Sequence, residues 1–458
     1  MLTTDITAHD IDLLRAAVVG EVVVPGDETY ETARLAWNLT ARQRPAVIVV
    51  PDRPDDVLAA VRFAREHGLR VAAQGTGHNA GPLGEAEDTV LIRTHKLRGV
   101  EIDVENRIAR VEAGALWMDV TGPASEHGLA ALAGSSPDVG VVGYSLGGGT
   151  GWLARKLGLA TNSVTAIEMV TADGRLVRAD EHEHADLFWA LRGGGGSFGV
   201  VTAMEFRLYA LESIVAGAMI WPAERSREVL HAWREWTATA PDEVTTSARI
   251  MNIPDMDGVP DMVRGRALVV IDGAVIGSVE EAGAILAPLR ALEPEIDMFA
   301  PVPPVALSYI HMDPEEPIPG DSETAMLDAA PAELIDALVD RFESNPLLLL
   351  VELRHLGGAL GRGHQSHGAL DRFDGEYLFF AAGMSVPEIA EPLRAQLAGV
   401  KEAVDAFGNG RGYLNFVEHP ADASTFYRAA TYARLRAVKS VYDPGNLFRA
   451  NHEIPPAA

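Results

Sequence analysis

A chain of 458 residues is too long for one ordinary core and predicts two packed units, while 47% hydrophobic and 22% charged residues are typical of a globular protein. The formal net charge of −27 argues against nonspecific nucleic-acid binding, because that binding needs lysine and arginine to displace counterions from phosphates. The absence of cysteine excludes disulfides, thiolate nucleophiles, iron–sulfur clusters and cysteine-ligated zinc.

Targeting signals and membrane spans are not recognised in the sequence. Residues 1–20 lack a basic segment followed by an apolar one, so they do not read as a secretory signal. No stretch approaches the roughly 18 apolar residues that a membrane helix needs. We therefore expect a cytoplasmic protein with no membrane partner, although a secreted form that has lost its signal would look the same.

A β-α-β pattern opens the predicted fold. Residues 46–50 form a short apolar run between two prolines, which indicates a buried strand. Residues 54–66 follow as a helix with proline in its first turn and a glycine just beyond its end. Residues 70–73 indicate a second strand, which leads directly into a glycine-rich loop at 74–84.

The pattern continues with strands, helices and a second glycine-rich stretch at 134–149. An Asp-Gly turn between apolar alternations marks a hairpin. The other elements predicted in this region are strands at 89–94, 99–113 and 199–208, helices at 116–127 and 184–191, and the hairpin at 164–178.

The sequence pattern changes near residue 210, and the earlier pattern returns near residue 410. The glycine loops stop, and strands alternate with helices, which is typical of a sheet covered by helices. The proline-rich stretch 301–320 reads as an irregular loop, and a last helix is predicted at about 423–441. The central elements are strands at 244–251, 266–272, 347–355 and 376–382, and helices at 223–239, 278–291, 331–342 and 387–406.

The loop at 74–84 is the first candidate site. Gly75, Gly77 and Gly81 let the backbone turn tightly and aim N–H groups inward, which favours a pyrophosphate guest; a flexible surface loop is the alternative. The spacing departs from the dinucleotide fingerprint and the loop follows the second strand, so a nicotinamide site is disfavoured. His78 lies inside this loop, where an imidazole beside a cofactor can act as nucleophile, ligand or base.

At this point the sequence resembles the berberine bridge enzyme-like branch of the vanillyl-alcohol oxidase / p-cresol methylhydroxylase superfamily of flavoproteins. The histidine loop Gly75–Gly81 and the stretch Ser136–Gly149 match two of its motifs. The block Phe188–Thr202 and the C-terminal segments at Tyr413–Asn415 and Tyr442–Asn451 match two more. The resemblance covers nearly the whole chain.

The resemblance implies an α+β fold with a two-part FAD-binding domain of the vanillyl-alcohol oxidase type. Residues 1–209 and 410–458 are expected to form this domain. Residues 210–409 are expected to form an inserted substrate domain, an antiparallel sheet covered by helices.

The resemblance also implies which residues approach FAD. His78 is expected to bond through a ring nitrogen to the flavin 8α carbon. The other residues expected at the cofactor are Gly75, Thr76, Gly77, Asn79, Gly81, Pro137, Val139, Gly140, Gly143, Tyr144, Gly148, Gly149, Asn162, Val164, Val201, Tyr413, Asn415 and Asn451.

Two departures from the family pattern limit the chemistry. Ser136 stands where many relatives carry a second, cysteinyl flavin bond, so the flavin has a single bond to His78 or, as the fallback, none. Phe416 stands where many relatives place a tyrosine that takes the substrate proton. The base is then Tyr413 or a residue of the substrate domain.

Glu352 and Tyr309 are the substrate-domain candidates for this base. Glu352 and Arg354 share one face of a predicted strand, with a solvated or mutually paired couple as the alternative. For Tyr309 the alternative is a buried structural tyrosine. His364 and His367 lie in a glycine-rich segment without a carboxylate and do not predict a metal site.

The function expected from these observations is an FAD-dependent oxidase or dehydrogenase. A hydride would pass from a C–H bond of an alcohol, sugar-like or secondary-metabolite substrate to flavin N5, and oxygen or another acceptor would take the electrons. Alternatives are an enzyme of oxidative cyclisation or desaturation, and a flavin-holding binding protein without turnover. A monomer and a homodimer stay equally open.

Overall fold

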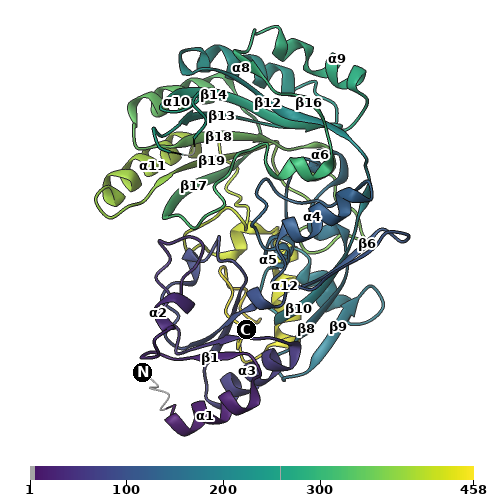
Figure 1. The fold of residues 1–458 in the computed structure, drawn as a ribbon, viewed down its shortest axis with the longest axis vertical. Helices are drawn as coiled ribbons and strands as arrows, with labels where there is room; N and C mark the ends of the chain where they lie inside the picture. The colour runs from purple at the N-terminus through teal and green to yellow at the C-terminus, as the bar shows by residue number, and fades with distance from the viewer. Residues whose placement is uncertain (1–5, 258, 458) are drawn as a thin grey trace.

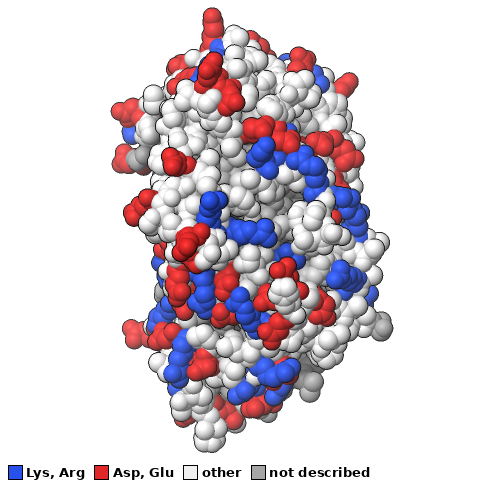
Figure 2. Space-filling model, turned by 90° about the vertical axis from the view of Figure 1, so that its right-hand side faces the viewer, with Lys and Arg blue, Asp and Glu red and all other residues white. Residues whose placement is uncertain are grey.

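The computed structural model describes residues 6–257 and 259–457. Figure 1 shows two stacked parts, with the middle of the chain above and both chain ends below. No helix of the described residues is long and apolar enough to cross a bilayer. On the face shown in Figure 2, acidic and basic side chains are interspersed. Some surface charges of the molecule form ion pairs, such as Arg178 with Glu205.

The predicted β-α-β pattern is confirmed, with one strand added between its two strands. β2 (Val47–Val50) and β3 (Arg70–Gln74) both pair in parallel with β4 (Thr89–Arg93). α3 (Pro54–Glu66) connects β2 to β3, and β1 (Glu21–Val23) pairs antiparallel with β2 at the edge. Every residue of β2 is buried, which explains why its sequence is a continuous apolar run.

A second, antiparallel sheet completes the lower part together with the C-terminal helix. Side chains of that helix, including Leu435 and Val438, lie in the same apolar cluster as Trp117 and Val141 from the N-terminal half. Segments more than 200 residues apart therefore form one core. The strands, in spatial order, are β5 (Val100–Asp103), β6 (Ile108–Glu112), β10 (Val200–Arg207), β8 (Val164–Val170) and β9 (Leu176–Asp180), and the helices are α4 (Trp117–Glu126), α5 (Val141–Leu146), α7 (Ala185–Leu191) and α12 (Ala429–Tyr442).

The upper part is a large antiparallel sheet with four helices on one face (Figure 1). Apolar residues of these helices pack with alternate residues of the strands in one cluster. The opposite face of the sheet therefore carries the other residues of each strand. The strands are β15 (Ile296–Asp297), β12 (Ile214–Pro222), β14 (Ala267–Val275), β13 (Val244–Asn252), β18 (Leu350–His355), β19 (Tyr377–Met384) and β17 (Gly320–Leu327), with β16 (Ala300–Val302) paired to β12, and the helices are α8 (Ser226–Thr237), α9 (Val279–Arg290), α10 (Ala332–Ser344) and α11 (Ala390–Asp405).

The predicted fold class is confirmed, with three local differences. β12 was not expected, because it is buried on both faces and its sequence shows no alternation. β17 was not expected either, because its first half is polar. The last helix begins at Ala429 rather than near 423, since Tyr427 and Arg428 are extended. The remaining short elements are α1 (Ala8–Ala17), α2 (Tyr30–Ala33), β7 (Leu129–Ala130), α6 (Ala154–Leu157) and β11 (Tyr209–Ala210).

The proline-rich stretch 301–320 is irregular as predicted, apart from the end of β16 and a 3-10 turn at Pro304–Ser308. The domain boundaries at 209/210 and 409/410 stay predictions.

Candidate functional site

The loop after β3 fixes the ring of His78. Gly77 has φ +90°, and a Cβ there would lie 2.8 Å from the Cβ of Ala36, so only glycine fits at this turn. The His78 ring stacks on Trp37 with 4.1 Å between centroids and 17° between planes. Its Nδ1 is hydrogen-bonded to the hydroxyl of Thr76 at 2.7 Å. Stacking and hydrogen bond together leave the ring one orientation.

Asp138 lies against the other side of His78. Its Oδ2 is 3.5 Å from His78 Nε2 and accepts a hydrogen bond of 2.6 Å from the indole of Trp37. Its Oδ1 accepts one of 2.6 Å from Ser136. Burial alone would raise the pKa of Asp138, but the contacts with His78, Ser136 and Trp37 lower it overall. The carboxylate is therefore ionised at neutral pH beside the predicted flavin-binding histidine.

Unsatisfied polar atoms gather in this loop. Among the described residues, Gln74 Nε2, His78 Nε2 and Asn79 Oδ1 are buried and have no hydrogen-bond partner. Each such atom costs about 1–3 kcal/mol when it stays unsatisfied. A Cβ added at Gly140 would meet nothing closer than 3.9 Å, and one at Gly143 nothing within 4 Å. The loop thus presents bonding groups to a ligand, and the second glycine-rich stretch presents open backbone at Gly140 and Gly143.

The C-terminal tail is bonded to the second glycine-rich stretch. Tyr413 Oη accepts hydrogen bonds from the Gly149 N–H at 2.9 Å and from Asn415 Nδ2 at 3.0 Å. A Cβ at Gly147 would lie 1.7 Å from Asn415 Oδ1, so glycine is required there. Burial raises the pKa of Tyr413, and the two donors lower it by less. The phenol is therefore neutral, and its oxygen already accepts two hydrogen bonds, which does not favour Tyr413 as the base.

Three further predicted residues tie the histidine loop to the tail. Asn79 Nδ2 donates to the Leu414 carbonyl at 3.0 Å, and Asn451 Nδ2 donates to the Asn79 carbonyl. A Cβ at Gly81 would lie 2.5 Å from the carbonyl oxygen of Glu418. The structure therefore brings together loop residues and tail residues that are more than 330 positions apart.

The remaining predicted cofactor residues lie around these segments. Pro137 and Val139 accept backbone hydrogen bonds from the start of α4, and Asn162 Oδ1 accepts the Gly368 N–H at 3.0 Å. Val164 and Val201 are buried on β8 and β10. Their approach to a cofactor, like that of Gly75, Gly148 and Tyr144, stays a prediction.

A buried cluster of charges covers the helix-free face of the upper sheet. Glu352 is 1% exposed, and Arg354 Nε lies 2.9 Å from its Oε1. Neither carboxylate oxygen of Glu352 has a hydrogen-bond partner in the part of the chain that the structure describes. The pairing with Arg354 matches the predicted alternative of a mutually paired couple, whereas the burial excludes a solvated one. We call the following residues the sheet cluster: Arg249, Asp272, His311, Asp313, Glu352 and Arg354.

Ser135 and Ser136 link the sheet cluster to the histidine loop. Ser135 Oγ donates to Asp313 Oδ2 at 2.6 Å, and Ser136 Oγ donates to Asp138 Oδ1 at 2.6 Å. Two adjacent residues therefore hold one carboxylate of the sheet cluster and the carboxylate that contacts His78. Sequence reasoning assigned no role to Asp138, although it lies inside the Ser136–Gly149 motif.

The other two predicted positions differ in their outcome. Tyr309 is 49% exposed, so the expectation of a buried structural tyrosine is wrong: the residue ends a short 3-10 turn at the surface. Phe416 packs its ring 5.2 Å from that of Tyr413, and the Arg354 guanidinium lies 4.9 Å above it. Phe416 therefore contacts the sheet cluster.

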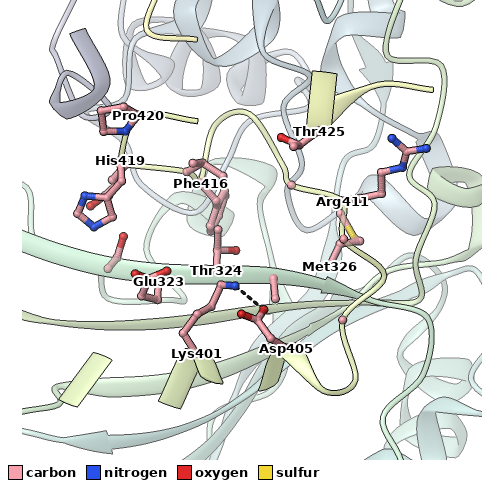
Figure 3. Close-up of a pocket in the computed structure, with 17 residues that line it drawn as sticks. Glu323, Thr324, Met326, Lys401, Asp405, Arg411, Phe416, His419, Pro420 and Thr425 are labelled. Carbon is pink, nitrogen blue, oxygen red and sulfur yellow. Dashed lines mark hydrogen bonds and ion pairs between the residues drawn. The ribbon is translucent and has the colours of Figure 1, made fainter. Parts of the chain in front are cut away.

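A cavity of about 270 Å³ reaches Phe416 from the edge strand β17 (Figure 3). Phe416 and His419 of the tail face Glu323 and Thr324 of the strand, and Lys401 pairs with Asp405 at the cavity floor. Phe416 belongs both to this lining and to the contacts of Arg354, so the cavity ends next to the sheet cluster.

Comparisons with known proteins agree with this geometry. A family model described as FAD binding domain matches residues 45–180, and one described as berberine and berberine like matches residues 412–455. The (R)-6-hydroxynicotine oxidase of Paenarthrobacter nicotinovorans is 29% identical over 96% of this chain and 97% of its own length. The chitooligosaccharide oxidase of Gibberella zeae is 26% identical over 94% and 92%.

Solved structures share the fold over nearly the whole chain. Physcomitrella patens BBE-like 1 has a TM-score of 0.85 at 21% identity, and the match covers 98% of this chain and 99% of that one. The 6-hydroxy-D-nicotine oxidase of Arthrobacter nicotinovorans has a TM-score of 0.80 at 28% identity, covering 96% and 98%.

Fold, site and comparisons define a flavoprotein, an FAD-dependent oxidoreductase. Within that class, the chain carries an FAD binding domain match and a berberine-like match, and its structural neighbours are berberine bridge enzyme-like proteins and 6-hydroxynicotine oxidase, which are similar to it over nearly its whole length. The unsatisfied polar atoms of the histidine loop and the open backbone at Gly140 and Gly143 fit such a cofactor.

Proposed function

We propose that the protein oxidises a small molecule by removing a hydride from a C–H bond beside a hydroxyl or amine, with FAD bonded covalently to His78. When bound, FAD would supply the oxidising power as acceptor of the hydride at N5, with oxygen or another acceptor as the final oxidant. The observation that carries the proposal is the pair Ser135 and Ser136, because it holds the sheet cluster and the histidine loop next to each other.

The histidine loop supports the covalent bond. His78 Nε2 is buried and makes no hydrogen bond within the described chain, while Nδ1 is held by Thr76. Asp138 lies 3.5 Å from Nε2 and stabilises positive charge on the ring. Such a ring has a free nucleophilic nitrogen once it is neutral. The remaining predicted cofactor residues, from Gly75 to Asn451, would surround the FAD.

Glu352 is the residue we propose as proton acceptor. Its carboxylate is buried and not occupied by hydrogen bonds, whereas Tyr413 accepts two. Arg354 Nε lies 2.9 Å from Oε1 of this carboxylate and pairs with it. Tyr309, half exposed at the surface, is a weaker candidate.

Acid precipitation of the purified yellow protein tests the covalent bond. Colour in the pellet, and its loss to the supernatant in His78→Ala, are the expected results. His67→Ala is the matched control, because His67 has the same 24% side-chain exposure and also stacks on an aromatic ring. Colour in the wild-type supernatant would contradict the covalent bond, and a colourless protein that FAD cannot reconstitute would contradict the whole proposal.

Anaerobic bleaching of the flavin absorbance tests the oxidation. The compounds tried first are those in the names of the relatives: 6-hydroxynicotine, chito-oligosaccharides and gluco-oligosaccharides. We expect one class to bleach the flavin, and Glu352→Gln to slow bleaching by about 100-fold or more. Phe416 in place of a tyrosine favours a second candidate, oxidative cyclisation or desaturation, which mass analysis of the product would distinguish from an aldehyde, ketone or imine.

A further inference from the structure

We propose that His311, held in place by Asp272, accepts the substrate proton from Glu352. The sheet cluster would then store one proton during each turnover. This inference rests on the proposed function. It assigns a role to residues that lie on three different strands and one loop and that no sequence motif brings together.

Asp272 fixes the tautomer of His311. The Asp272 side chain is fully buried; its Oδ1 accepts from Ser247 Oγ at 2.5 Å, and its Oδ2 accepts from Arg249 Nη2 at 2.6 Å. His311 Nδ1 lies 2.8 Å from the same Oδ2. Burial alone would raise the pKa of Asp272, but Arg249 and His311 lower it strongly overall. An ionised carboxylate only accepts, so Nδ1 carries the hydrogen and Nε2 keeps its lone pair.

That lone pair faces the proposed proton acceptor. His311 Nε2 lies 3.7 Å from Glu352 Oε1, 3.8 Å from Asp313 Oδ1 and 3.3 Å from Arg354 Nη2. A neutral Nε2 accepts from the Arg354 guanidinium, whereas a protonated one is attracted by the two carboxylates. A shift of under 1 Å would bring Glu352 and His311 within hydrogen-bond distance for direct transfer.

Charge balance gives room for one proton. With His311 neutral, two guanidinium groups face three carboxylates and leave one negative charge. Four members of the sheet cluster are between 0% and 2% exposed, so water screens this charge poorly. One added proton makes the sheet cluster neutral. Among the described residues, uncharged groups also contact it, namely Trp152 beside His311, Phe416 under Arg354 and the hydroxyls of Ser135 and Ser247, and the phenols of Tyr144 and Tyr413 lie within electrostatic range of Arg354.

The proton balance is complete within the proposed reaction. The substrate loses a hydride from carbon to FAD and a proton from its hydroxyl or amine to the Glu352 carboxylate. Glu352 passes that proton to His311 Nε2 and becomes a carboxylate again, ready for the next substrate. The stored proton leaves to solvent, or to the reduced acceptor, when the flavin is reoxidised.

Nitrogen chemical shifts of the histidine rings in the ¹⁵N-labelled holoenzyme test the dyad without any substrate. The His311 signal is the one that His311→Gln removes. We expect the hydrogen on Nδ1 in the wild type, and loss of this preference in Asp272→Asn, which keeps the side-chain shape and so guards against a variant that merely misfolds. A wild-type hydrogen on Nε2 would overturn the inference, whatever the enzyme oxidises.

The pH profile of flavin reduction, measured by stopped flow with the compound that bleaches the flavin, tests the transfer. We expect His311→Gln to slow reduction by about 10- to 100-fold with an unchanged substrate dissociation constant, and to alter the pH profile. His355→Gln is the control, since His355 is also buried in this sheet and burial holds its pKa near 3, so it takes no part in proton transfer. Equal rates and profiles for His311→Gln and wild type would overturn the inference while leaving the proposed function intact.

Discussion

The protein contains two histidine–aspartate pairs whose surroundings differ. His78 is partly exposed, lies 3.5 Å from Asp138 and stacks on Trp37, so its partners are aromatic and neutral apart from one carboxylate. His311 is 2% exposed and lies 2.8 Å from Asp272, among arginines and other carboxylates. The first environment leaves His78 Nε2 without a hydrogen bond, as the proposed bond to the flavin needs, whereas the second surrounds His311 with the carboxylates that the proposed proton transfer needs. The two proposals thus assign different chemistry to the same residue pair because its surroundings differ.

Removing Asp272 should break the second pair with the largest effect. Asp272→Ala leaves Arg249 and His311 buried without their shared partner, which costs about 3–5 kcal/mol for a buried ion pair. Urea unfolding at pH 7 measures this loss. Asp336→Ala is the control: Asp336 pairs with Arg227 and His231 at the surface, and its removal should leave the midpoint nearly unchanged. Equal losses of stability in the two variants would show that the buried Asp272 contributes no more than the surface Asp336.

Gly77→Ala should damage the first pair through the backbone. The new Cβ would meet Ala36 in a left-handed conformation, so we expect a loss of about 1–3 kcal/mol and a displaced His78 ring. The fraction of flavin retained in the acid pellet should fall with it. Gly84→Ala shares a positive φ but has open space around it, and should keep the flavin. Full retention in Gly77→Ala would show that the turn is not needed to orient the ring.

Acid should distinguish the two aspartates. The pKa of each is lowered by folding, so the stability each contributes is present above the unfolded value of about 3.9 and is lost as pH falls through the folded value. The gap in urea midpoint between wild type and Asp272→Asn should be widest above pH 4 and narrow below it. Asp138→Asn should show the same pH dependence with a smaller difference in urea midpoint from wild type, because Asp138 is less buried than Asp272. A gap that widens in acid would reverse the assigned sign.

The two serines offer the smallest but most selective change. Ser135→Ala and Ser136→Ala each remove one hydrogen bond to a carboxylate, worth about 1 kcal/mol. We expect Ser135→Ala to slow flavin reduction and leave the bonded flavin fraction unchanged. Ser136→Ala should lower that fraction and leave reduction of the bonded enzyme unchanged. Absorbance of the acid pellet and stopped-flow rates separate the two outcomes, and an identical phenotype would mean that the pairs act as one unit.

The sequence predicts the first pair better than the second. The glycines of the 74–84 loop lie next to His78 in the chain, so local conformational requirements reveal the site. Even there Asp138 was assigned no role, because its approach to His78 depends on Trp37 and Ser136 from other segments. Most of the residues predicted to approach FAD were assigned from the family resemblance and not from the loop itself.

The second pair is invisible in the sequence for a topological reason. Asp272, Arg249 and Glu352 are on three strands whose order in the sheet differs from their order in the chain. Alternation placed Glu352 and Arg354 on one face, but the neighbours on that face come from strand pairing. His311 lies in a loop whose prolines suggested only irregular structure, two residues after the surface residue Tyr309.

The hydrogen bonds between Asn79 and the tail have a consequence for biosynthesis. Leu414 and Asn451 are translated 335 and 372 residues after Asn79, so the ribosome has made nearly the whole chain before these contacts of the histidine loop can form. At a synthesis rate of about 5–20 residues per second, that interval lasts about 20 seconds or more. The proposed bond between FAD and His78 would therefore form only after translation is almost finished, and we expect nascent chains stalled in the central sheet to be colourless.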